Sequence, residues 1–257
     1  MYSGKKLVEL PTEILYKKGS STDYIFPASI TKVMTAIVVL ENIADLGTPI
    51  NLNREMYAYL KEESASVAGF LPNETVSAED LLYGLLLPSG AECAIGLAEY
   101  IAGSEKDFVK LMNEKAWLIG MTHTRFANTT GLHNIAHFST LEDIAVLLTY
   151  ALKNDTFYEI FTTAQHTSQP TNLHPEGLTV TSTLFFRTES LAFEGGQILG
   201  GKTGFTDEAG QCLASLAEIN DELFVLITCG AQRENARQQL HIDDALAVYS
   251  AIAASRQ

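Results

Sequence analysis

The chain has 257 residues, of which 46% are hydrophobic and 19% are charged, so it is long enough to bury a substantial core. Its formal net charge of −14 at pH 7 argues against nucleic acid as a partner, because phosphate binding requires clustered lysine and arginine. No apolar run approaches the roughly 18 residues that a membrane span requires, so we expect no transmembrane segment.

The first elements predicted are two short strands at 7–10 and 13–18, which a turn joins. A helix follows, beginning near Pro27, since proline favours the first turn of a helix. Its residues from 30 to 40 are apolar on nearly every face, which is typical of a helix that is buried all round. We therefore expect this helix to lie at the centre of the molecule.

The chain from about residue 41 to 163 is predicted to be mainly helical, because apolar residues recur there at helical spacing. Its amphipathic stretches lie at 78–87, 92–102, 105–119 and 141–152. From about residue 197 the apolar period changes to that of strands. The strands are predicted at 197–201, 211–219 and 223–229, with a turn at Asn220-Asp221 between the last two and a closing helix at about 235–254.

This order of elements predicts an α+β fold, in which both ends of the chain build an antiparallel sheet of about five strands flanked by helices. A mainly helical lobe is inserted between the two sheet-forming parts. We expect a single domain over residues 1–257, with a sheet lobe at 1–41 and 196–257 and a helical lobe at 42–195. A site is expected in the cleft between the two lobes.

Ser29 and Lys32 lie three residues apart in the apolar segment YIFPASITKVMTA, residues 24–36. In a helix this spacing places the hydroxyl and the amine on one face. Burial among apolar side chains lowers the pKa of a lysine, so that a neutral amine can accept the proton of the serine. This pair alone leaves a structural alternative open, in which Ser29 caps the helix and Lys32 extends its amine to water.

Two further segments carry polar residues of chemical interest. The triplet Lys202-Thr203-Gly204 lies where a strand is predicted to end, and such a triplet arises by chance far less often than Ser-x-x-Lys. Its structural alternative is a glycine-bounded strand end with a solvated lysine. Between the two motifs, Ser89 lies in the segment LLLPSGAE, in a turn between two helical stretches.

In this order, the three motifs resemble those of the D-alanyl-D-alanine carboxypeptidases, the low-molecular-mass penicillin-binding proteins of the serine β-lactamase and transpeptidase superfamily. The segments that carry the resemblance are PASITKVMTA, LLYGLLLPSG, GLAEY, RFANTTGLH, HFSTLEDIA and GGKTGFTDEAGQCLA, and they extend over nearly the whole chain. The resemblance implies a β-lactamase/transpeptidase-like fold. It also implies a serine carboxypeptidase that cleaves peptidoglycan stem peptides through an acyl-enzyme, is acylated by β-lactams and needs no metal or other cofactor.

The resemblance further implies a role for each matching residue. Ser29 would be the nucleophile and Lys32 the base that takes its proton. Ser89 would relay a proton toward the leaving amine, and Lys202 would attract the carboxylate of the substrate. The backbone N–H groups of Ser29 and Phe205 would form the oxyanion hole, at about 3 kcal/mol per donor. The remaining residues implied in substrate binding are Thr203, Gly204, Thr206 and Arg237.

One position departs from the family pattern. The family usually has Ser-x-Asn in the second motif, and this chain has Ala91 where the asparagine would be. The missing amide would bond the acyl-side carbonyl of the substrate, and losing such a bond costs roughly 1 to 3 kcal/mol. We expect slower acylation rather than none, with Glu92 or water partly filling the gap.

Several alternatives remain open at this point. A class A β-lactamase is the nearest, but the chain has no Glu-x-x-Leu-Asn loop between the second and third motifs. A weakly catalytic penicillin-binding sensor on the same fold is suggested only by Ala91. A metallopeptidase is suggested by His133 and His137, although Asn134 stands where the glutamate of a zinc-helix motif should be. A Ser-His-Asp hydrolase is disfavoured, since no Gly-x-Ser-x-Gly elbow occurs.

The cysteines are interpreted first as structural residues without a chemical role. Counting back from the turn at Asn220-Asp221 brings Cys212 opposite Cys229, where both are expected to be small apolar residues of the sheet. A disulfide between them is the alternative.

The resemblance also implies an extracytoplasmic location, on the cell-wall side of the membrane, because peptidoglycan stem peptides are cross-linked outside the cell. The segment MYSGKKLVEL at the start has no hydrophobic signal region, so we expect the signal and the anchor to be absent from this chain. The expected partners are a stem peptide as substrate and β-lactams as inhibitors.

Overall fold

A computed structural model describes residues 14–15, 18, 23–188, 190–232, 234–235 and 238–256. The strand predicted at 7–10 and Arg237 lie outside these ranges. Of the strand predicted at 13–18, residues 14–15 and 18 are described, and none of the three belongs to a strand.

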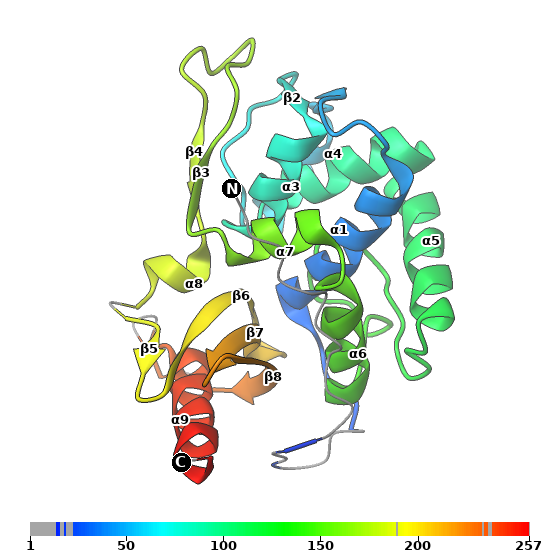
Figure 1. The fold of residues 1–257 in the computed structure, drawn as a ribbon. Coiled ribbons are helices and arrows are strands. Elements are labelled where there is room, and N and C mark those ends of the chain that lie inside the picture. The colour runs from blue at the N-terminus through cyan, green and yellow to red at the C-terminus, as the bar shows by residue number, and fades with distance from the viewer. Residues whose placement is uncertain are drawn as a thin grey trace.

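The elements form a mainly helical region and, toward the end of the chain, a sheet (Figure 1). In chain order they are a 3-10 turn (Ala28–Ile30), α1 (Thr31–Asn42), β1 (Pro49–Asn51), α2 (Met56–Glu62), β2 (Thr75–Ser77), α3 (Ala78–Leu86), α4 (Ala91–Ala102), α5 (Glu105–Leu118), α6 (Leu141–Ala151), α7 (Asp155–Thr162), β3 (Gln165–Thr167), β4 (Thr179–Thr181), α8 (Thr183–Phe186), β5 (Ala192–Phe193), β6 (Gly196–Thr206), β7 (Gly210–Ile219), β8 (Glu222–Ala231) and α9 (Leu240–Ser255).

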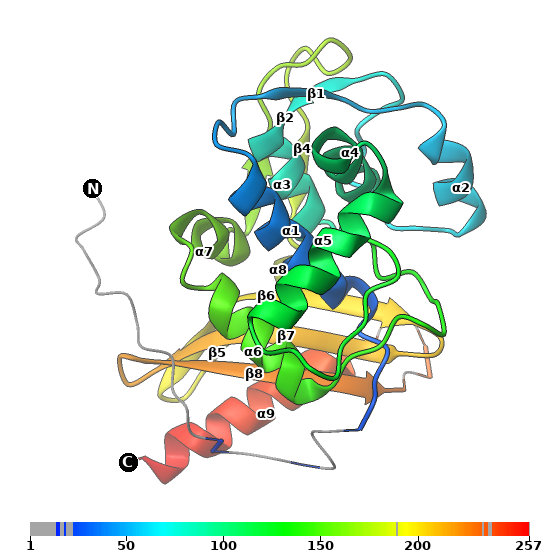
Figure 2. The same ribbon diagram turned by 90° about the vertical axis from the view of Figure 1, so that its right-hand side faces the viewer.

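Helix α1 lies at the centre, as its apolar sequence predicts. Every residue from Ile30 to Val39 is buried, and the helix packs against α3, α4, α5 and α6. Figure 2 shows α1 enclosed by these neighbours above the sheet. A helix that is hydrophobic all round is stable only when it is buried in this way.

Side-chain caps begin several of the surrounding helices. Ser77, Ser104 and Thr140 each accept a hydrogen bond from the backbone N–H three residues later, at the starts of α3, α5 and α6. Such caps satisfy N–H groups that have no partner within the helix. Helices α3 to α6 begin and end within one residue of the bounds predicted from apolar spacing.

The sheet has the strand order β5-β6-β7-β8 and is antiparallel throughout. Asn220 and Asp221 both have positive φ, 49° and 65°, as a two-residue hairpin turn requires. Helix α9 packs on one face of the sheet, and the helical region lies over the other face (Figure 2). This mixture of an antiparallel sheet and flanking helices confirms the predicted fold class.

Three predictions about the C-terminal elements were inaccurate. Strand β6 does not end at residue 201, because it pairs with β7 along its length and continues to Thr206. The Lys-Thr-Gly triplet therefore lies within the strand rather than at its end. Helix α9 begins at Leu240, not near residue 235. The short hairpin β3–β4 was not predicted, since three-residue strands give too little alternation to detect.

The register between β7 and β8 runs from Ile219↔Glu222 to Leu213↔Thr228, as counted from the turn. A bulge then interrupts the pairing beside Cys212. Cys93, Cys212 and Cys229 are all free thiols in the structure, which agrees with the apolar interpretation and not with the disulfide.

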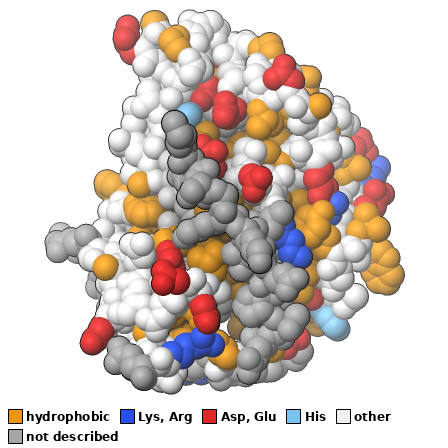
Figure 3. All heavy atoms as spheres, viewed as in Figure 1, with side chains coloured by type: hydrophobic (Ala, Val, Ile, Leu, Met, Phe, Trp, Pro, Cys, Tyr) orange, Lys and Arg blue, Asp and Glu red, His pale blue; other side chains and the backbone are white. Residues whose placement is uncertain are grey.

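The surface reflects the acidic composition. Acidic side chains are scattered over the face drawn in Figure 3 and do not gather into one patch. Among the helices of the described residues, none has both the length and the apolar character needed to cross a membrane.

Candidate active site

Ser29 and Lys32 face each other at the start of the central helix. Ser29 lies in the 3-10 turn, and Lys32 lies in the first turn of α1, with its Nζ atom 3.1 Å from the Oγ atom of Ser29. Lys32 is only 2% exposed and Ser29 is half-buried, so the amine does not extend to water. The N-cap residues of the 3-10 turn and of α1 are Pro27 and Ile30, not Ser29, and neither makes a side-chain capping bond. Both parts of the structural alternative for this pair are therefore wrong.

The burial of Lys32 changes its acidity. Removal from water lowers the pKa of Lys32 to about 7, although the negative charge of Glu92 opposes this shift. At neutral pH a large fraction of the amine is therefore uncharged. A neutral amine beside a hydroxyl can accept its proton.

A loop distant in sequence holds the amine in place. Lys32 Nζ donates to the backbone oxygen of Thr130 at 2.6 Å. Asn128 shapes this loop, since its Oδ1 atom accepts from the N–H of Gly131 at 2.7 Å. Gly131 has a φ of +81°, and a Cβ atom there would lie 1.9 Å from the backbone oxygen of Ala28. The loop therefore packs directly on the turn that carries Ser29.

Strand β6 closes on the same turn from the other side. A Cβ atom at Gly204 would lie 3.0 Å from the backbone nitrogen of Ser29 and 3.1 Å from the Cβ atom of Ala28. Only glycine permits this approach without displacement of the neighbours. The triplet is thus adjacent to the Ser29 turn, and Phe205 follows directly in the strand.

Lys202 is fully buried in β6, which contradicts the alternative of a solvated lysine. Its Nζ atom donates to the backbone oxygen of Thr203 at 2.9 Å. Burial, and then the positive charges of Lys32 and Arg187, hold the pKa of Lys202 well below its usual range. An anion placed beside this amine would favour its charged form.

The side chains of Thr203 and Thr206 already have partners in the protein. The Oγ1 atom of Thr203 lies 2.6 Å from the Oγ1 atom of Thr183, and the Oγ1 atom of Thr206 accepts from the N–H of Ala209 at 3.0 Å. A hydroxyl that accepts one bond still has its proton to donate.

Ser89 lies in the turn between α3 and α4 with a φ of +71°. Its side chain is buried, and its Oγ atom has no hydrogen-bond partner within the described residues. A buried hydroxyl without a partner costs about 1–3 kcal/mol, so it marks a position kept for something other than stability.

Glu92, one of the two groups expected to fill the gap beside Ala91, is bound through one carboxylate oxygen to the loop at 68–69. Its Oε1 atom accepts from the N–H groups of Ala68 at 2.7 Å and Gly69 at 2.9 Å, and the residue is fully buried. Burial raises the pKa of Glu92, while these backbone donors act against the rise. The carboxylate therefore holds the loop at 68–69 against α4.

His133 and His137 have separate partners, which does not favour a shared metal. His137 is buried, lies 2.8 Å from the Oγ1 atom of Thr31 and accepts from the N–H of Ala127. Burial lowers the pKa of His137 to about 4. His133 instead lies 3.5 Å from Glu208. The described residues contain no group of three or more His, Cys, Asp or Glu side chains that could hold a metal ion.

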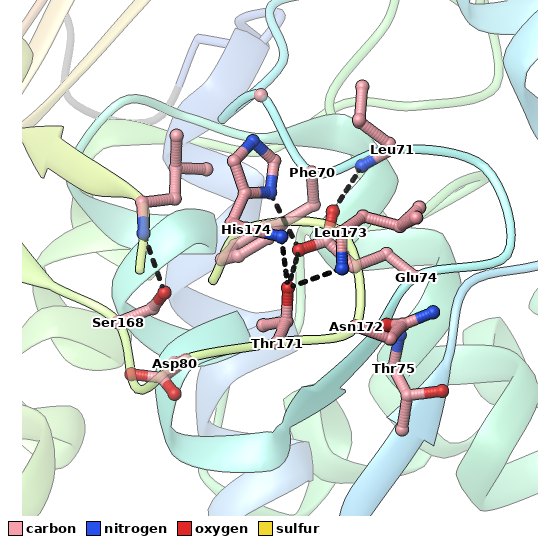
Figure 4. A network of polar contacts seen from close by, with 12 residues as sticks. Phe70, Leu71, Glu74, Thr75, Asp80, Ser168, Thr171, Asn172, Leu173 and His174 are labelled. Atoms are coloured by element: carbon pink, nitrogen blue, oxygen red, sulfur yellow. Dashed lines mark hydrogen bonds and ion pairs between the residues drawn. The ribbon is translucent and has the colours of Figure 1, made fainter. Parts of the chain in front are cut away.

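Two buried carboxylates attach the β3–β4 hairpin to the helical region. Figure 4 shows Glu74 accepting from Thr171, from the N–H of Leu71 and from the Nδ1 atom of His174, the last at 2.7 Å. Asp80 in α3 lies 2.7 Å from the Nε2 atom of His166 in β3. Sequence reasoning missed this network, because its members are separated by about a third of the chain.

Comparison with known proteins decides the family. The peptidase S11 family model, described as D-alanyl-D-alanine carboxypeptidase, matches residues 7–233. The chain belongs to this family. This membership confirms the resemblance drawn from the motifs, and it does not favour a class A β-lactamase.

Two curated relatives and one solved structure illustrate the likeness. The chain is 32% identical over 251 residues to the D-alanyl-D-alanine carboxypeptidase DacF of Bacillus subtilis (strain 168), covering 95% of this chain and 61% of that protein. It is 31% identical over 210 residues to the D-alanyl-D-alanine carboxypeptidase of Streptomyces sp. (strain K15), covering 79% of this chain and 71% of that protein. The crystal structure of the Streptomyces K15 DD-transpeptidase superposes with a TM-score of 0.78 at 27% identity, covering 93% of this chain and 92% of that one.

Proposed function

We propose that the chain is a serine D-Ala-D-Ala carboxypeptidase that acts on peptidoglycan stem peptides through an acyl-enzyme and is also acylated by β-lactams. The observation that carries the proposal is the 3.1 Å contact between Lys32 Nζ and Ser29 Oγ, in a member of the peptidase S11 family. A buried amine with a pKa of about 7 can act as a base at neutral pH.

Acylation would begin with transfer of the Ser29 proton to the neutral amine of Lys32. The Oγ atom then attacks the carbonyl carbon of the penultimate D-alanine, and the backbone N–H groups of Ser29 and Phe205 hold the oxyanion. Ser89, whose hydroxyl has no partner within the part of the chain that the structure describes, relays a proton to the nitrogen of the leaving D-alanine. Water then attacks the acyl-enzyme and regenerates Ser29.

The terminal carboxylate of the substrate would lie beside β6. Lys202 supplies positive charge there, and Thr203 and Thr206 supply hydroxyl donors along the same strand. Gly204 lets the strand approach the Ser29 turn. Arg237, which lies outside the described residues, would assist in binding the carboxylate.

Peptidoglycan as substrate implies an extracytoplasmic site of action, and we propose the cell-wall side of the membrane. We also keep as a proposal the division into a sheet lobe at 1–41 and 196–257 and a helical lobe at 42–195. Because Ala91 supplies no amide, we propose that acylation is slower than in a protein with asparagine at this position.

The first measurement is the release of D-alanine from diacetyl-Lys-D-Ala-D-Ala by the wild type and by Ser29→Ala. The second is the intact mass of each protein after incubation with a penicillin. We expect release and an adduct only in the wild type. Absence of an adduct on Ser29 would refute the mechanism, and an adduct without D-alanine release would indicate the sensor instead. Rapid multiple-turnover hydrolysis of nitrocefin would indicate a β-lactamase.

A further inference from the structure

Thr183 connects two of the three motifs, although it belongs to none of them. It is the first residue of α8, between the β3–β4 hairpin and the sheet. Its N–H donates to the backbone oxygen of Leu87 at 2.9 Å, two residues before Ser89. Its Oγ1 atom lies 2.6 Å from the Oγ1 atom of Thr203 in the Lys-Thr-Gly triplet.

The direction of the hydrogen bond between the two hydroxyls has a chemical consequence. Each hydroxyl has one proton and two lone pairs, so within this pair only one residue donates to the other. A carboxylate accepts hydrogen bonds and donates none. If Thr203 donates to Thr183, its proton is not available to a carboxylate. If Thr183 donates, the proton of Thr203 remains available.

The structure fixes Thr183 from several sides. The preceding Ser182 donates its N–H to the backbone oxygen of Ala164 at 2.8 Å. The following Leu184 is fully buried, and a Cβ atom at Gly201 would lie 2.9 Å from its Cδ2 atom, so α8 lies closely on β6. Thr203 itself is only 5% exposed. The two hydroxyls therefore have little freedom to separate.

We propose that Thr183 is a positioning residue for the carboxylate of the substrate. Its hydroxyl donates to Thr203 Oγ1, so that the proton of Thr203 points toward the C-terminal carboxylate of the peptide or the carboxylate of a penicillin. The inference rests on the proposed function, because it assigns the orientation of one of the groups that the function requires.

The experiment compares acylation of Ser29 by benzylpenicillin with acylation by its methyl ester, which has the same ring but no anionic carboxylate. The quantity measured is the ratio of the two second-order acylation rates, followed by intact mass. In Thr183→Val we expect the ratio to fall about tenfold or more, since a hydrogen bond to a charged group is being misdirected. In Thr183→Ser, which keeps the hydroxyl, we expect the ratio of the wild type.

Thr179→Val is the matched control. Thr179 forms the same kind of hydroxyl pair, 2.8 Å from Thr167, but on the exposed hairpin. We expect it to leave the ratio unchanged. Thr183→Ala serves as a second variant without the hydroxyl if Thr183→Val folds poorly, and circular dichroism monitors the folding of each protein.

The possible results separate this inference from the proposed function. Loss of rate in Thr183→Val that is equal for the penicillin and its ester would show a purely structural role and overturn the inference alone. Acylation of the wild type at the same rate by benzylpenicillin and by its methyl ester would also overturn it. A wild type that neither compound acylates would refute the proposed function, and the inference with it.

Discussion

At the scale of single residues, the environment of Lys32 determines what its amine can do. An exposed lysine has a pKa near 10.5, and burial in α1 lowers the pKa of Lys32 to about 7. The sequence indicates this burial, because apolar residues surround the lysine on both sides. It does not indicate the backbone oxygen of Thr130 that orients the amine.

The acidity of Lys32 predicts how acylation depends on pH. Only the neutral amine accepts the proton of Ser29, so the rate of penicillin acylation is expected to rise with pH and to level off above a midpoint near pH 7. Rapid-quench measurements of the acylation rate between about pH 5 and pH 9 test this. Lys32→Arg keeps a positive charge but cannot act as a base, and we expect it to form no adduct in that range. A rate independent of pH would contradict the role of Lys32.

At the scale of elements, the site depends on how a turn, a loop and a strand pack together. The turn at Ala28–Ile30 lies between the loop at Gly131 and the strand at Gly204, and neither glycine leaves room for a side chain. Close approach of backbones is therefore what places Ser29 beside the Lys-Thr-Gly triplet. The sequence identifies the turn, the loop and the strand, but it does not show that they contact one another.

Substitution of Gly131 tests this packing. Gly131→Ala places a methyl group against the backbone oxygen of Ala28 and strains a φ of +81°, so we expect a strongly reduced acylation rate and a loss of stability above about 2 kcal/mol. Gly103→Ala is the control, because Gly103 has a φ of +75° but nothing within 4 Å of the added atom. We expect it to cost about 1 kcal/mol and to leave acylation unchanged. Equal effects of the two changes on urea unfolding and acylation would refute the argument.

At the scale of the whole molecule, buried carboxylates join parts of the chain that are far apart in the sequence. Glu74 is fully buried and accepts from Thr171 and His174 of the segment that links β3 to β4. The hairpin leads into α8, which lies on β6. The arrangement of the hairpin and the active-site strand thus depends in part on this network.

Removal of the Glu74 charge is expected to destabilise the fold. Glu74→Gln removes the buried negative charge that accepts hydrogen bonds from Thr171 and His174. We therefore expect a loss of about 3 kcal/mol in the free energy of unfolding. Asp107→Asn is the control, because Asp107 pairs with Lys110 on an exposed surface, where ion pairs contribute little to stability, and we expect no measurable loss. Chemical denaturation at neutral pH measures both. A loss of less than about 1 kcal/mol in Glu74→Gln would contradict the role given to the network.

The sequence by itself determined the family, the central helix, the bounds of α3 to α6 and the pairing of Ser29 with Lys32. These features depend on spacing along the chain and on local hydrophobicity, which a linear sequence contains. Even the register from Ile219↔Glu222 to Leu213↔Thr228 follows from a two-residue turn and simple counting.

Only the tertiary structure decided which distant groups meet at the site. Thr130 lies 98 residues from Lys32, and Thr183 lies 20 residues from Thr203. The hydrogen bonds from Ala68 and Gly69 to Glu92 Oε1 were likewise not predictable. Hydrogen bonds of this kind depend on where the folded backbone brings a carbonyl or a hydroxyl, and no residue type or spacing in the sequence specifies that position.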